Sequence, residues 1–341
     1  MIRVGQKNLL TDVPGILVGN SEDQAVQSGV TVVLPDERVT AAIDVRGGAP
    51  GTREIEALDP TCLVDKIDAV VLSGGSGFGL DAAGGVMTWL AAGGRGYPVG
   101  KAIVPIVPSA ILFDLQDHAY QSWGQEPPYR ALGIEAARNA AEHFSLGNVG
   151  AGLGATVGAA SIGHINGGLG SASFVIEADG RPAVTIAALA AVNPVGNVLM
   201  PGSDVFWAWP FEQDGEFGGR RPSGNLINPV VDDRFPGEVA GNTTLVVVAT
   251  DAALSKAEAQ RVAIMAHDGM ARAIRPVHTP YDGDTVFVLS TGMHRLDTLV
   301  ADLARIGSLA ADCTARAIAR GVFEADDLDN ISSYRSLYPT P

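Results

Sequence analysis

The chain has 341 residues, enough for one large domain or two modest ones with a packed core. Hydrophobic residues make up 46% of it and charged residues 18%, which is typical of a well-buried globular protein. Its net charge of −15 disfavours nucleic acids and anionic membrane surfaces as partners.

The cysteines and the chain start exclude several further classes. Cys62 and Cys313 have no companion ligand spacing, so we predict neither a disulfide framework nor a zinc site and expect both to be small core residues. The first residues lack the apolar core of a signal peptide, and the most apolar run, 102–113, is short and contains Pro105 and Pro108. We therefore expect a cytoplasmic protein that does not enter a membrane.

Strand and helix patterns are interleaved along the first two thirds of the chain. Helical spacing predicts helices over 79–92 and 131–143, and Gly residues cluster at the junctions between elements. Short apolar runs predict strands over 30–34, 69–72, 103–107 and 183–189. The fold class is therefore α/β or α+β.

A long irregular segment follows, over 211–242. It is polar, contains six Gly and three Pro, and shows no clear periodicity. Such a segment inside a compact protein is usually a functional loop or a linker. It ends at Thr243, where the apolar run 243–251 predicts a buried strand.

Regular structure continues after this strand. Ser255 and Glu258 match the two ends of a capping box, which predicts a helix over 255–274. The remaining pattern predicts a turn over 280–284, a strand over 285–290 and a closing helix over 296–320.

Thr243 is a candidate nucleophile. An N-terminal Thr can activate its own hydroxyl with its α-amine, whose ordinary pKa is about 8, so one residue supplies both nucleophile and base. This requires that the Asn242–Thr243 bond first be cut by attack of the Thr hydroxyl on the preceding carbonyl. The alternative is an ordinary strand start, because two β-branched residues before a Val run are common in sheets.

Asp282 and Asp284 flank a Gly and could point toward one site, where they would hold an ammonium group or a hydroxyl proton. The alternative is a plain Asp-Gly turn. The six histidines show no metal-binding pattern. His267 and His278 could contact the residues of such a site without touching the substrate, although hydrogen bonding in the core or at the surface is the simpler interpretation.

The Gly-rich turn over 74–79 offers a different class of function. Gly77, Gly79 and Ala82 satisfy a relaxed dinucleotide fingerprint, but no acidic residue follows at the required distance of about 20 residues. Phe78 stands where a nucleophile elbow needs Gly. A non-catalytic or dinucleotide-binding protein built around this turn is the alternative function, and it predicts an intact chain.

Seven motifs occur in an order that resembles one known family. They are DVPGILVG at 12–19, DVRGGAPGTRE at 44–54, GGSGFGL at 74–80, GNVGAG at 147–152, NPVG at 193–196, GNTT at 241–244 and RPVHTPYDGDT at 275–285. Together they resemble the L-aminopeptidase/D-esterases, β-peptidyl aminopeptidases and nylon-oligomer (6-aminohexanoate oligomer) hydrolases. The match extends over nearly the whole chain.

The resemblance implies a four-layer αββα sandwich of the N-terminal-nucleophile type. It implies one hydrolase domain over 1–341 that cuts itself into a large subunit, 1–242, and a small subunit, 243–341. These heterodimers would assemble into a larger oligomer, with a tetramer favoured. The implied activity is hydrolysis of amide bonds in short peptides or linear aliphatic amide oligomers, with no cofactor and no metal.

The resemblance also implies roles for individual residues. Thr243 would be the nucleophile, and Asn193 would lie near the acyl oxygen as oxyanion donor or orienting group. Asp282 and Asp284 would position the Thr243 amine and hydroxyl. A Thr nucleophile with an Asp-Gly-Asp pair is more like the nylon-oligomer hydrolases than the Ser-based aminopeptidases.

The sequence departs from the nylon-oligomer hydrolases at two positions. Ala159 or its neighbours stand where those enzymes have an active-site Lys, and the chain has no Lys between Lys101 and Lys256. Phe113 stands where they have an active-site Tyr, and its ring cannot donate a hydrogen bond. We therefore assign no catalytic Lys, and the α-amine of Thr243 must carry more of the base role.

Overall fold

The computed structural model describes residues 1–115, 123–158, 164–177, 180–223 and 242–339. Within these residues one sheet has seven strands in the spatial order β1 (Ile2–Val4), β13 (Gly168–Ile176), β14 (Val184–Asn193), β15 (Thr243–Ala252), β16 (Thr285–His294), β4 (Val39–Val45) and β6 (Lys66–Ile67). The second has five, in the order β2 (Ile16–Asp23), β3 (Ser28–Pro35), β7 (Val70–Ser73), β10 (Ser109–Ile111) and β5 (Gly51–Arg53). Two strand pairs stand apart, β8 (Tyr97–Val99) with β9 (Ala102–Val104) and β11 (Thr156–Val157) with β12 (Ile165–Asn166). The α-helices are α1 (Asp81–Ala92), α2 (Tyr129–Arg138), α3 (Lys256–Ala273), α4 (Leu299–Phe323) and α5 (Tyr334–Leu337).

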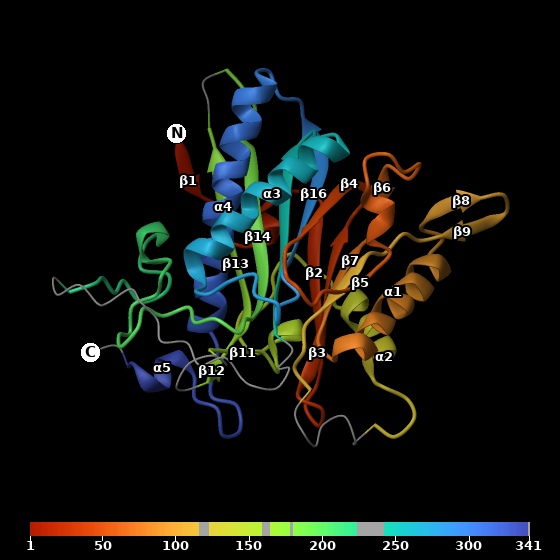
Figure 1. The fold of residues 1–341 in the computed structure, drawn as a ribbon. Helices are drawn as coiled ribbons and strands as arrows, with labels where there is room; N and C mark the ends of the chain where they lie inside the picture. Colours follow the sequence, from red (N-terminus) through yellow and green to blue (C-terminus); the bar gives the residue numbers. More distant parts are fainter. Residues whose placement is uncertain (116–122, 159–163, 178–179, 224–241, 340–341) are drawn as a thin grey trace.

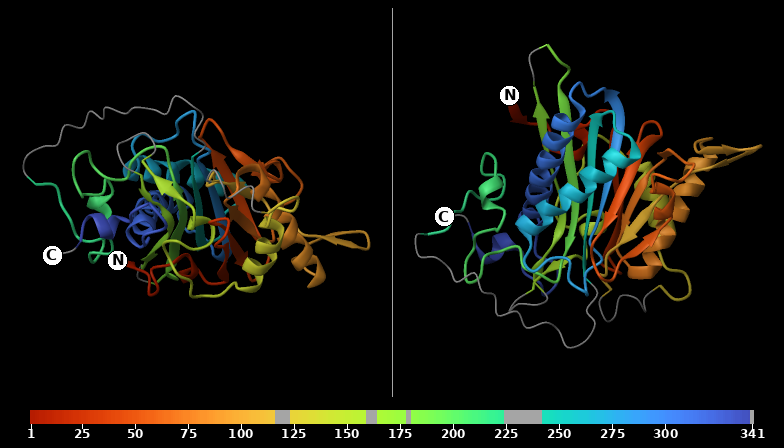
Figure 2. Two further views of the ribbon diagram at one scale, coloured as in Figure 1. Left: turned by 90° about the horizontal axis from the view of Figure 1, so that it is seen from below. Right: turned by 45° about the horizontal axis from the view of Figure 1, so that its top comes forward.

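The elements stack in four layers, with helices on the outside and the two sheets between them (Figures 1 and 2). α3 and α4 cover the outer face of the seven-stranded sheet, and α1 and α2 cover that of the five-stranded sheet. A separate cluster of buried hydrophobic residues fills each of the three spaces between layers. This arrangement is the αββα sandwich that the family resemblance implies.

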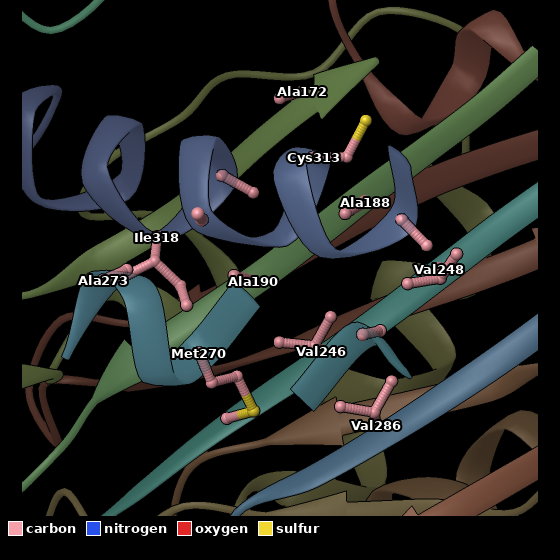
Figure 3. Packing of buried hydrophobic residues seen from close by; sticks show 14 of the residues in the cluster. Ala172, Ala188, Ala190, Val246, Val248, Met270, Ala273, Val286, Cys313 and Ile318 are labelled. Carbon is pink, nitrogen blue, oxygen red and sulfur yellow. The ribbon is translucent and has the colours of Figure 1, made fainter. Parts of the chain in front are cut away.

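The space under α3 and α4 is filled by small and medium side chains. Met270 of α3, Ile318 of α4 and Val246 and Val248 of β15 belong to one cluster of buried hydrophobic residues in this space (Figure 3). The alternate β15 residue Val247 points instead into the cluster between the two sheets. Because both faces of β15 are covered, the strand is apolar almost without interruption.

The structure confirms the helix predicted over 255–274. Ser255 caps α3 by accepting a hydrogen bond from the Glu258 N–H, and the Glu258 side chain returns to the Ser255 backbone. The predicted strands over 30–34, 69–72, 183–189 and 285–290 correspond to β3, β7, β14 and β16, and the helices over 79–92 and 296–320 to α1 and α4, with shifted ends.

Three predictions were wrong in detail. The helix expected over 131–143 is α2, which ends at Arg138 because Ala141 pairs with Val18 at the edge of β2. The strand expected over 103–107 stops at Val104, since Pro105 follows. Cys62 is exposed rather than in the core, whereas Cys313 is buried as expected.

No helix in the described ranges is both long enough and apolar enough to span a membrane. Nor do those ranges contain a group of three or more His, Cys, Asp or Glu side chains placed to hold a metal ion.

Candidate active site

Three neighbouring strands bring the candidate residues to one end of the seven-stranded sheet. β14 ends at Asn193 and its antiparallel neighbour β15 begins at Thr243, so the two residues face each other. β16 runs parallel to β15 and therefore begins at the same end, directly after Asp284. Strand order thus unites residues that lie far apart in the sequence.

The Asn242–Thr243 peptide is buried and held by the loop before β16. Thr243 is 3% exposed, and its hydroxyl donates to the carbonyl oxygen of Asn242. The N–H of Gly283 lies 3.0 Å from that carbonyl oxygen and 3.1 Å from Thr243 Oγ1. The N–H of Asn242 donates to the carbonyl of Tyr281 at 3.3 Å. One backbone donor therefore reaches both the hydroxyl and the carbonyl that would react with it.

Asp284 is fixed by three donors. Its Oδ1 accepts the N–H of Thr244 at 2.8 Å. Its Oδ2 accepts the N–H of His278 at 3.0 Å and lies 2.8 Å from Nδ1 of the same residue. The carboxyl group is 1% exposed, so it joins the start of β15 to the loop before β16 in an interior setting.

Asp282, two residues before Asp284, also joins separate segments of the chain through its carboxyl group. Its Oδ1 accepts the N–H of Val195 at 3.1 Å, and its Oδ2 accepts the N–H and hydroxyl of Thr279. Burial, followed by the negative charge of Asp284, raises the pKa of Asp282 above its ordinary value. Among the described residues, the two carboxyl groups bind neighbours of Thr243 rather than Thr243 itself.

Asn193 is 1% exposed, and its amide group is used at both ends. Oδ1 accepts the N–H of Thr156 at 2.8 Å, and Nδ2 donates to the carbonyl of Phe113 at 2.8 Å. Because the amide nitrogen carries two hydrogens, one remains for another acceptor. Asn193 can therefore orient the surrounding loops and still donate to an acyl oxygen.

The motif over 44–54 packs its backbone against the acidic turn. The N–H of Arg46 donates to the carbonyl of Asp284 at 3.0 Å, and that of Ala49 to the carbonyl of Asp282 at 2.8 Å. A side chain at Gly47 would collide with this turn, because its Cβ would lie 2.3 Å from the Asp282 carbonyl oxygen. The glycines of this motif thus allow two backbones to meet closely.

Phe113, one of the two departures from the nylon-oligomer hydrolases, contributes to the site through its backbone, because its carbonyl holds Asn193. Its exposed ring supplies no polar group. The second departure, Ala159, lies outside the described residues.

The Gly-rich turn does not offer its backbone to a phosphate. Its first three N–H groups are already used: Gly74 donates to the Gly29 carbonyl, Gly75 to Asp114 Oδ1 and Ser76 to the Leu112 carbonyl. A phosphate site at such a turn needs these groups unoccupied. The internal carboxylate of Asp114 therefore argues against the dinucleotide-binding alternative.

Sequence reasoning missed the roles of Gly283, His278 and Thr156. Gly283 acts through its backbone N–H, which its residue type does not signal. His278 was noted without a role. Thr156 acts through its backbone N–H, so its residue type gives no signal.

Comparison with known families matches residues 8–335 of this chain to peptidase family S58. A protein from Mycobacterium tuberculosis named as an uncharacterized aminopeptidase is 41% identical over 97% of this chain and 98% of its own length. The 6-aminohexanoate-oligomer endohydrolase of Paenarthrobacter ureafaciens is 30% identical over 91% of this chain and 82% of its own length.

A solved structure is similar in fold. The L-aminopeptidase D-Ala-esterase/amidase of Ochrobactrum anthropi, described as a variant of the Ntn hydrolase fold, superposes with a TM-score of 0.68 at 19% identity, over 99% of this chain and 96% of that one. This likeness confirms the fold type predicted from the sequence.

Proposed function

The chain belongs to peptidase family S58 and is an amide-bond hydrolase, and on that premise we propose that it cuts its own Asn242–Thr243 bond and then uses Thr243 as its nucleophile. The products would be the fragments 1–242 and 243–341. The observation that carries this proposal is the position of the Thr243 hydroxyl against the Asn242 carbonyl, with the Gly283 N–H reaching both.

The cut begins when Thr243 Oγ1 attacks the carbonyl carbon of Asn242. The new C–O bond displaces an electron pair onto the carbonyl oxygen, where the Gly283 N–H stabilises the negative charge. The C–N bond then breaks, and the proton lost by the hydroxyl ends on the departing nitrogen. Water hydrolyses the resulting ester, which leaves a carboxylate on Asn242 and both an amine and a hydroxyl on Thr243.

Turnover repeats this chemistry on an external amide. The Thr243 α-amine takes the hydroxyl proton during attack and passes it to the leaving amine, and an acyl-enzyme ester forms and is hydrolysed by water. The second N–H of Asn193 Nδ2 donates to the acyl oxygen, while Asp282 and Asp284 hold the surroundings of the amine. Because Asn242 and Thr243 are both buried, Asn242 must withdraw before a substrate can enter.

The substrates we propose are short peptides with a free amino end, with linear aliphatic amide oligomers also accepted. Two relatives support this range, since one is named as an aminopeptidase and the other as an endohydrolase of 6-aminohexanoate oligomers. A buried acidic pair suits a substrate that carries an ammonium group.

We further propose a cytoplasmic enzyme in which the two-fragment units assemble into a larger oligomer, with a tetramer favoured. Light scattering coupled to gel filtration tests the assembly directly. A mass of one unit at micromolar concentration would contradict it.

Intact-mass spectrometry of the purified protein tests self-cleavage. We expect the fragments 1–242 and 243–341 from the natural sequence and one uncut chain from Thr243→Ala. Thr243→Ser retains a hydroxyl and should still cut. An uncut natural chain after prolonged incubation, or cutting of the Thr243→Ala chain at the same bond, would exclude the proposed nucleophile.

A further inference from the structure

A histidine stands behind the acidic turn in a position that the reaction scheme above does not use. His278 contacts a single oxygen of Asp284 with two of its own groups, the backbone N–H at 3.0 Å and ring Nδ1 at 2.8 Å. Its backbone lies in the left-handed region, with φ at 56°. This conformation is uncommon for a residue other than Gly and is kept where the surroundings require it.

The contacts define which ring nitrogen carries the proton. A carboxylate can only accept, so Nδ1 of His278 must be the donor to Asp284. Nε2 of His278 is buried and has no hydrogen-bond partner among the described residues. The contact with Asp284 therefore requires a proton on Nδ1.

The ring of a second histidine packs against the His278 ring. The His267 ring in α3 meets the His278 ring edge to face, with centroids 4.8 Å apart. His267 Nε2 lies 3.0 Å from the carbonyl oxygen of Asp44, which can only accept, so the proton of His267 is on Nε2. Burial lowers the pKa of His267 to about 4, so the ring stays neutral at neutral pH.

We propose that His278 is a positioning residue that acts through Asp284 to fix the first residues of β15 for self-cleavage. Asp284 holds the Thr244 N–H on its other oxygen, at 2.8 Å. The chain of hydrogen bonds therefore runs from His278 through Asp284 to the residue after the nucleophile. Loss of the Nδ1 donor would let the carboxyl group rotate, and Thr243 would no longer be held against the Asn242 carbonyl. This inference rests on the proposed role of Thr243.

The test replaces His278 with Asn or with Gly, two residues that readily adopt the left-handed backbone conformation of this position. His278→Asn keeps a side-chain N–H at about the position of Nδ1, whereas His278→Gly removes it, and both keep the backbone N–H. Self-cleavage is followed by pulse-labelling the chain with methionine during cell-free synthesis, since both fragments contain Met residues. His267→Phe is the control, because it keeps a ring against His278 but removes the bond to Asp44.

We expect His278→Gly to cut at least about tenfold more slowly than the natural chain, the scale of losing a hydrogen bond to a charged group. His278→Asn and His267→Phe should cut within about threefold of the natural rate. A Gly variant at the natural rate would overturn the inference, and so would an Asn variant as slow as the Gly variant.

A second measurement does not depend on cleavage. In the Thr243→Ala chain, long-range nitrogen–proton NMR spectra of His278 should show a proton on Nδ1. An Nδ1 without a proton would overturn the inference whether or not the bond is cut. If the natural chain is not cut while the Nδ1 proton is present, the proposed function fails and the contact geometry stands.

Discussion

Asn193 lies directly opposite Thr243 in the antiparallel register of β14 and β15. The last residue of one strand therefore faces the first residue of its neighbour, at the point where both leave the sheet. The amide of Asn193 in turn joins this point to Thr156 and Phe113. A substitution at Asn193 therefore removes the hydrogen bonds to Thr156 and Phe113 as well as a possible donor to the reacting oxygen.

Replacing Asn193 with Ala should reduce both the stability of the fold and the rate of catalysis. The N–H of Thr156 and the carbonyl of Phe113 lose their partner, so we expect the free energy of unfolding to fall by about 1–3 kcal/mol. Loss of an oxyanion donor should also slow amide hydrolysis about 100-fold or more. Urea denaturation measures the loss of stability, and the rate at which the processed enzyme hydrolyses a short peptide measures the loss of activity.

Asn166→Ala is the matched control for this prediction. Asn166 is equally buried, at 1% exposed, and its amide nitrogen also donates to backbone carbonyls, those of Asp326 and Ile331, each at 2.9 Å. We expect a similar loss of stability with a rate close to that of the natural chain. Equal slowing in both variants would mean that Asn193 contributes stability alone.

Gly283→Ala should abolish self-cleavage while the chain still folds. A Cβ at this position would lie 2.7 Å from Thr243 Oγ1 and 2.9 Å from the carbonyl oxygen of Ala49. The hydroxyl must then move away from the Asn242 carbonyl. We expect cutting to slow by more than about 100-fold, as judged by intact mass over time.

Gly77→Ala provides the comparison, because a Cβ there has no atom within 4 Å among the described residues. Its rate should equal that of the natural chain. Normal cutting by Gly283→Ala would show that the hydroxyl does not need its observed position.

The buried carboxyl group of Asp114 should make stability depend on pH. Burial raises its pKa to about 6, against the opposing effect of hydrogen bonds from Gly75 and Ser28. Because the pKa is higher in the folded chain than in the unfolded chain, protonation stabilises the fold. This stabilisation is complete below about pH 4 and is lost as the pH rises through about 6.

Asp114→Asn removes this titration and keeps the shape of the side chain. The stability of the natural chain relative to the variant should fall by up to about 3 kcal/mol between pH 4 and pH 7. Urea denaturation of both proteins at each pH measures the difference, in which contributions from other carboxyl groups such as Asp282 cancel. A difference that does not change with pH would contradict the raised pKa.

Arg316→Leu should be strongly destabilising. The Arg316 side chain is fully buried, lies 2.6 Å from Glu216 and 4.4 Å from the centre of the Phe174 ring, and also binds Asn8. Its loss leaves a buried carboxylate poorly compensated, at a cost of about 3–5 kcal/mol.

The measurement is urea denaturation of the uncut Thr243→Ala chain with and without Arg316→Leu. The control is Arg3→Leu, which removes an exposed ion pair with Glu177 and should cost less than about 1 kcal/mol. A loss below about 1 kcal/mol for Arg316→Leu would show that Arg320, 3.6 Å from Glu216, is sufficient compensation.

Much of the fold could be predicted from local patterns. The capping box of Ser255 and Glu258 defines the start of α3, because it is formed by residues three apart. The end of α2 could not be predicted in this way. That helix stops where Ala141 pairs with Val18, a contact between segments more than 100 residues apart.

The same distinction applies to the site. Thr243, Asp282 and Asp284 could be nominated because they lie within motifs that follow one another in the order of a known family. The Gly283 N–H could not, since a backbone donor is present at almost every residue and only the strand order aims this one at the Asn242 carbonyl. The environment of Asn193 is equally a product of loops that the sequence pattern does not align.

The place of β15 and β16 in the seven-stranded sheet has a consequence for assembly. Both strands belong to the fragment 243–341, yet they lie between β14 and β4 of the fragment 1–242. Before the proposed cut, the peptide bond acts as a tether, and the sheet closes in a first-order reaction at a high effective concentration. After the cut, the same sheet could reform from denatured fragments only through a bimolecular encounter. The peptide bond thus speeds assembly of the sheet and is dispensable once the sheet is built, so the processed enzyme would refold more slowly than its uncut precursor.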